Sequence, residues 1–177
     1  MPQQYSFQEL FVEQVNDLFS AEEQILSVLP RLISVISSGD LREALTHYLQ
    51  EVGQHRDHLT IVLEGQSLVP RGSLCKAIEG MLEEADEVMG HGGNSAVKDA
   101  ALIAILQRLQ HYKIAVYGTA RTFARHLNES KAMDFLQHAL NEEGEADKKL
   151  TKLAEGGMFT TGINEEAIKE AHIAQTS

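Results

Sequence analysis

Hydrophobic residues recur at every third or fourth position along most of this chain, which is the spacing of one face of an α-helix. The repeat predicts four long helices, at about residues 6–37, 41–64, 96–128 and 131–155. A shorter amphipathic helix is expected at about 74–89, and a weak helix within the tail 158–177. The strict alternation that marks a β-strand is nearly absent. The pattern therefore predicts an all-α protein.

Turn residues divide the four long helices into two pairs. Ser38-Gly39-Asp40 separates the first two helices, with Asp40 as the expected N-cap of the second. Asn128-Glu129-Ser130 separates the last two, and Gly156-Gly157 is expected to end the last one. A long crossover, which contains the short helix, joins the two pairs. This connectivity is typical of the ferritin-like antiparallel four-helix bundle, and we predict one such domain over residues 1–177.

Acidic residues interrupt the apolar faces of these helices. Glu22 stands in the first face, Glu51 and His55 in the second, and Glu143 and Asp147 in the last. A buried carboxylate is costly unless it is paired or bound to a metal. The two pairs with i, i+4 spacing each place two side chains on one side of a helix, as in bundles that hold two iron or manganese ions. These residues therefore predict a metal site, although a single acid in such a face often reaches out to solvent.

The third long helix of the bundle lacks a matching carboxylate. Gln110 occupies the corresponding position, and an amide oxygen is a weak, neutral ligand for hard cations. Lys113, one turn later, can direct its ammonium group at the same cluster. Two hypotheses stay open: either the core binds a metal with Gln110 as a sixth ligand, or Lys113 neutralises the carboxylates and no metal binds.

Composition narrows the range of partners. Twenty-six acidic residues against 15 Lys and Arg give a net charge of -11, which disfavours binding to nucleic acid or to an anionic membrane. The single cysteine, Cys75, excludes an intramolecular disulfide and Cys-rich metal motifs. Neither a signal peptide nor a membrane-spanning run is evident, so we expect a cytoplasmic protein. Most histidines are expected at the surface, with His111 the nearest to the core.

Several segments resemble the YciF/YciE-type bacterial stress-response proteins of the ferritin-like superfamily. The matching segments follow one another along nearly the whole chain: Ser20–Gln24, Leu49–Glu51, Glu79–Val88, Lys98–Ile103, His111–Tyr112, Tyr117–Thr119, Asn141–Glu143 and Asp147–Leu150. The resemblance implies a four-helix bundle, a homodimer and, in many members, a dinuclear metal site. It departs at one place, because family members carry Glu on both sides of the His-Tyr pair, where this chain has Gln110 and Lys113.

The resemblance implies candidate metal ligands at Glu22, Glu51, His55, Glu143 and Asp147, with iron as the expected metal and manganese or zinc as alternatives. A bound redox-active metal would make oxygen or peroxide chemistry possible. The competing hypothesis is a metal-free, dimeric structural or interaction protein. A shell-forming iron store of the ferritin type is less favoured, since the resemblance implies a dimer.

Overall fold

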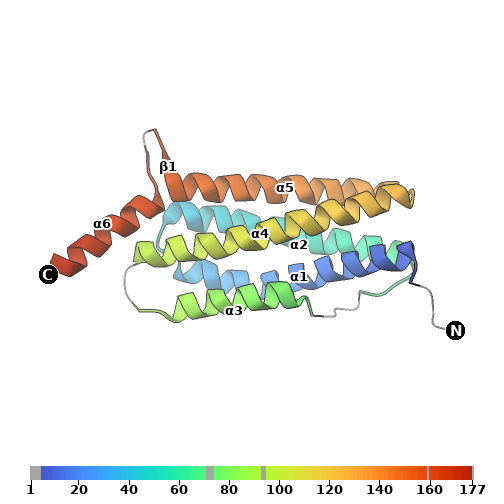
Figure 1. Cartoon of the computed structure of the whole chain (residues 1–177), viewed down its shortest axis with the longest axis horizontal. Coiled ribbons are helices and arrows are strands. Elements are labelled where there is room, and N and C mark those ends of the chain that lie inside the picture. The colour runs from blue at the N-terminus through green and yellow to red at the C-terminus, as the bar shows by residue number, and fades with distance from the viewer. Residues whose placement is uncertain (1–4, 71–73, 93–94, 159, 177) are drawn as a thin grey trace.

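The structure, a computed structural model, describes residues 5–70, 74–92, 95–158 and 160–176, and helices dominate it (Figure 1). The helices are α1 (Phe7–Val35), α2 (Gly39–Gly65), α3 (Lys76–Gly90), α4 (Ser95–His126), α5 (Ser130–Glu155) and α6 (Ile163–Thr176). Between α5 and α6 lies a small antiparallel hairpin of β1 (Gly156–Gly157) and β2 (Thr160–Thr161). Within the part of the chain that the structure describes, no helix combines the length and hydrophobicity needed to cross a membrane.

Four long helices form the bundle, as the sequence predicted. Figure 1 shows α1, α2, α4 and α5 side by side along the long axis of the molecule, with α3 alongside α1 and α4. Short turns join α1 to α2 and α4 to α5, and the crossover that carries α3 links the two hairpins. This is the predicted all-α, ferritin-like arrangement. The final helix, α6, packs mainly against α4 at the end of the bundle.

The turn between α1 and α2 differs in one detail from the sequence-based expectation. Ser38, and not Asp40, is the N-cap of α2, because its hydroxyl accepts a hydrogen bond from the backbone N–H of Leu41 at 3.4 Å. Asp40 already lies within the first turn of the helix. The turn is tied to α4 by the buried Asp99, whose carboxylate accepts bonds from the Ser37 backbone (3.1 Å), the Ser37 hydroxyl (2.6 Å) and the Ser38 backbone (2.8 Å).

Glycine ends α5, as predicted. Gly156 has a φ of +78°, and a Cβ atom there would lie 2.5 Å from the backbone nitrogen of Gly162. Only glycine fits this conformation and this close approach. The hairpin that follows was not predicted, since strands of two residues are too short to produce a recognisable alternation.

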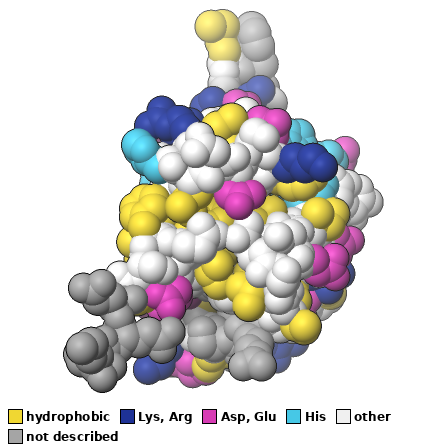
Figure 2. All heavy atoms as spheres, turned by 90° about the vertical axis from the view of Figure 1, so that its right-hand side faces the viewer, with side chains coloured by type: hydrophobic (Ala, Val, Ile, Leu, Met, Phe, Trp, Pro, Cys, Tyr) yellow, Lys and Arg dark blue, Asp and Glu magenta, His cyan; other side chains and the backbone are white. Residues whose placement is uncertain are grey.

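The core has two apolar parts, one on each side of a polar layer. One part includes Phe11, Leu18, Leu63 and Leu136, and the other includes Ile25, Leu45, Leu106 and Leu150. At the end of the bundle where α1 begins, hydrophobic side chains are visible among charged ones (Figure 2). Tyr5, Phe7, Leu68 and Val69 are among the exposed large hydrophobic residues of the chain.

Candidate functional site

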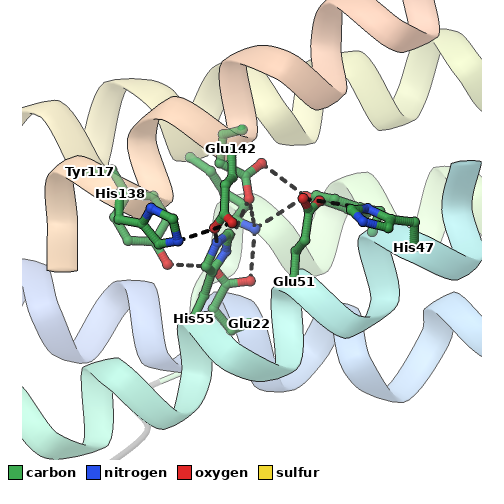
Figure 3. A network of polar contacts seen from close by, with 10 residues as sticks. Glu22, His47, Glu51, His55, Tyr117, His138 and Glu142 are labelled. Atoms are coloured by element: carbon green, nitrogen blue, oxygen red, sulfur yellow. Dashed lines mark hydrogen bonds and ion pairs between the residues drawn. The ribbon is translucent and has the colours of Figure 1, made fainter.

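The polar layer is built from one charged side chain of each bundle helix. Glu22 comes from α1, His55 from α2, Lys113 from α4 and Glu143 from α5, and none is more than 1% exposed. We call these four residues the ion cluster. Each stands on the side of its helix that faces the bundle axis. Figure 3 shows Glu22 and His55 close together, and ion pairs with Lys113 and Glu143 bring the four side chains into one cluster.

Lys113 joins the two carboxylates of the ion cluster. Its Nζ lies 2.8 Å from Oε2 of Glu22 and 2.5 Å from Oε1 of Glu143. It also donates to the hydroxyl of Tyr48 at 3.1 Å. The ammonium group thus has three oxygen neighbours, and those of Tyr48 and Glu143 accept hydrogen bonds from it. The contact with Glu22 is an ion pair whose angle does not meet hydrogen-bond geometry.

Two buried tyrosines donate further hydrogen bonds to the two carboxylates. Tyr48 donates its hydroxyl to Oε2 of Glu143 at 2.9 Å, and Tyr117 donates to Oε1 of Glu22 at 2.5 Å. Burial, together with the neighbouring carboxylates, raises the pKa of both phenols well above the ordinary value. Both tyrosines therefore remain protonated and act as hydrogen-bond donors.

His55 is the second cation of the ion cluster. Its Nδ1 lies 3.4 Å from Oε1 of Glu143 and 3.6 Å from Oε1 of Glu22, and its Nε2 lies 2.7 Å from Oε2 of Glu142. Burial lowers the pKa of His55, but the contacts with Glu143 and Glu22 outweigh that effect and raise the pKa to about 10. The imidazole is therefore protonated at neutral pH.

The charges of the ion cluster balance. Burial alone would raise the pKa of Glu22, yet Lys113 and His55 outweigh it and lower that pKa below the ordinary value. Burial also acts to lower the pKa of Lys113. The neighbouring carboxylates of Glu143 and Glu22 outweigh this effect, so the pKa of Lys113 lies well above its ordinary value. The two carboxylates and the two cations lie in close pairs, which is one condition under which buried charges are tolerated. The carboxylates also accept hydrogen bonds from Tyr48, Lys113 and Tyr117.

A chain of polar groups leads from the ion cluster to the surface. Glu142, which contacts His55, also lies 3.1 Å from Nε2 of His138 through its second oxygen. The side chain of His138 is 60% exposed, and that of Glu142 is 23% exposed. Glu142 and His138 therefore connect the buried imidazole to solvent.

Six residues were predicted as metal ligands, and the structure places them in two groups. Glu22, His55 and Glu143 converge, with one potential ligand atom from each within 4.8 Å of the others. The remaining three lie at the margin of the ion cluster. Glu51 faces His47, at 3.4 Å; Asp147 lies 3.2 Å from both His111 and Gln107; and Gln110 is buried, with an Oε1 that has no hydrogen-bond partner among the described residues.

His111 is exposed, contrary to the expectation that it would approach the core. Its side chain is 68% exposed and reaches Asp147 on the outside of the bundle. Its neighbour Tyr112 turns inward instead and donates to Asp17 at 2.6 Å.

Three residues that surround the ion cluster were not predicted from the sequence, namely Tyr48, Tyr117 and Glu142. The two tyrosines stand in apolar faces, and this was a usable signal, since a buried hydroxyl needs a hydrogen-bond partner. Glu142 precedes Glu143 in the chain and is partly exposed, so it resembles any surface acid of a helix.

The residues present do not fit the dinuclear metal site that the fold family implies. The ammonium of Lys113 fills the space between the two carboxylates, because its Nζ lies within 2.8 Å of an oxygen of each. Glu51 and Asp147 are engaged with other side chains at the margin. A metal ion at Glu22, His55 and Glu143 would have to displace the ammonium group and a proton at the same time.

Comparison with known proteins identifies the family. The model of a family described as Domain of unknown function (DUF892) matches residues 6–168. Protein YciF of Escherichia coli is 37% identical over 150 residues, which is 84% of this chain and 90% of that protein. This confirms the resemblance recognised in the sequence.

Two solved structures share the fold. The crystal structure of the E. coli stress protein YciF matches with a TM-score of 0.80 and 36% identity, covering 85% of this chain and 95% of that chain. A protein called YcfI, described as a putative structural protein from Rhodopseudomonas palustris, matches with a TM-score of 0.82 and 35% identity, covering 86% and 98%. The chain therefore belongs to the DUF892 family and is a relative of the YciF stress proteins.

Proposed function

We propose that this chain is a stress-associated structural or interaction protein in which Lys113 takes the place of a metal ion. The observation that carries the proposal is the position of the Lys113 Nζ, buried and within 2.8 Å of a carboxylate oxygen on each of two other helices. The association with stress comes from YciF, which is described as a stress protein.

The ion cluster has a structural role in this proposal. It links one residue from each bundle helix, so a change in the register of any helix would leave a buried charge without its partner. Buried polar groups can specify one packing arrangement in this way, even where they add little to the free energy of unfolding. A relative described as a putative structural protein agrees with such a role.

The assembly and compartment belong to the same proposal. We propose a homodimer, as the resemblance to the YciF-type proteins implies, and the exposed apolar residues Phe7 and Val69 offer contact surface for it. The proposal also places the protein in the cytoplasm, as expected from the sequence.

Thermal unfolding with added metal tests the proposal. A ligand that binds the folded state raises the melting temperature. We expect Fe²⁺ under anaerobic conditions, Mn²⁺ and Zn²⁺ each to leave the melting temperature of the parent protein unchanged. The matched variant carries Lys113→Glu and Gln110→Glu, which restores the carboxylates of the family, and we expect metal to stabilise it by about 5 °C or more. Stabilisation of the parent by the same amount would contradict the proposal.

Metal binding is the second candidate function. It is favoured by the convergence of Glu22, His55 and Glu143 to within 4.8 Å, which provides two hard oxygen donors and one imidazole. In that case iron, with manganese or zinc as alternatives, would bind after Lys113 moved aside. A pH-dependent metal affinity in the parent, with release of protons on binding, would favour this candidate.

A further inference from the structure

We draw no further inference here: the strongest candidate, the cavity of about 520 Å³ between α2 and α5, is bordered by a cluster of carboxylates (Asp40, Glu43, Glu51 and Glu145), and no second feature of the residues that the structure describes points to a ligand there.

Discussion

The ammonium of Lys113 stabilises two carboxylates that would otherwise be intolerable in the core. Glu22 and Glu143 are fully buried, and each is in contact with Lys113, with His55 and with a tyrosine hydroxyl. Removing one partner of such a pair costs far more than the pair itself contributes, because the remaining charge is left buried and uncompensated. Loss of Lys113 should therefore be strongly destabilising.

Lys113→Met should lower the free energy of unfolding by about 3–5 kcal/mol, measured by urea denaturation at pH 7. Lys148→Met is the matched control, because Lys148 pairs with Glu145 on the surface with both side chains over 70% exposed; we expect a change within about 0.5 kcal/mol. Adding Glu22→Gln and Glu143→Gln to Lys113→Met should recover much of the loss. A loss below about 1 kcal/mol in the single variant would contradict the role of Lys113.

The protonated state of His55 predicts a dependence of stability on pH. The folded-state pKa is about 10, raised from 6.5, so the protonated imidazole stabilises the folded protein fully below pH 6.5. This contribution is lost as the pH rises from 6.5 through 10, with a slope of up to about 1.4 kcal/mol per pH unit. On the acid side the sign reverses, because the lowered pKa of Glu22 makes its contribution disappear as the pH falls below 4.5.

Urea denaturation at a series of pH values from about 5 to about 10 checks this dependence, because the series spans both the ordinary histidine pKa and the raised pKa of His55. In His55→Gln the loss of stability between neutral and alkaline pH should be reduced relative to the parent. An unchanged profile in that variant would show that another group is responsible.

The sequence predicted the centre of the ion cluster but not its margin. Glu22, His55, Lys113 and Glu143 were visible as charged gaps in apolar faces. The two i, i+4 partners, Glu51 and Asp147, were expected to point the same way as His55 and Glu143. Four residues turn an α-helix through about 40° more than one full turn, and this offset carries both carboxylates to the margin, where His47, His111 and Gln107 contact them.

At the scale of the elements, periodicity located every helix of the described chain to within about three residues at each end, which is ordinary for helix boundaries. The prediction was wrong at the start of α2, where the choice of N-cap residue decides the helix boundary. Asp40 and Ser38 are both good N-cap residues, and the choice between them depends on Asp99, which lies about sixty residues away in the sequence. A local pattern contains no information about such a contact.

Asp99→Ala tests the importance of the contact between Asp99 and the turn that joins α1 to α2. Its carboxylate accepts bonds from Ser37 and Ser38 while 1% exposed, so its removal should lower the free energy of unfolding by about 2–3 kcal/mol. Asp57→Ala, at an exposed aspartate of α2, is the matched control and should change stability by less than about 0.5 kcal/mol. Both are measured by urea denaturation, and equal effects would contradict the role of Asp99.

At the scale of the whole molecule, the lengths of the connections predicted the topology. Two short turns allow only neighbouring antiparallel helices, and the long crossover allows the second hairpin to pack in the ferritin-like order. The assembly of several chains leaves no comparable pattern in one sequence, so the homodimer remains a proposal from the resemblance.

Size-exclusion chromatography with multi-angle light scattering tests the homodimer. We expect a mass twice that of the 19.6-kDa chain. The dimer should persist when EDTA is added, because no metal takes part in its assembly. A monomer, or a shell of many subunits of the ferritin type, would contradict this prediction.

Metal content tests most directly whether Lys113 replaces a metal ion. Parent protein and the variant with Lys113→Glu and Gln110→Glu are reconstituted in parallel with Fe²⁺, Mn²⁺ or Zn²⁺, passed through a desalting column, and analysed for metal per chain by inductively coupled plasma mass spectrometry. We expect metal near zero in the parent and about one or two ions per chain in the variant. Retention of about one or more ions per chain by the parent, lost on Glu22→Gln or Glu143→Gln, would contradict the replacement of a metal by Lys113.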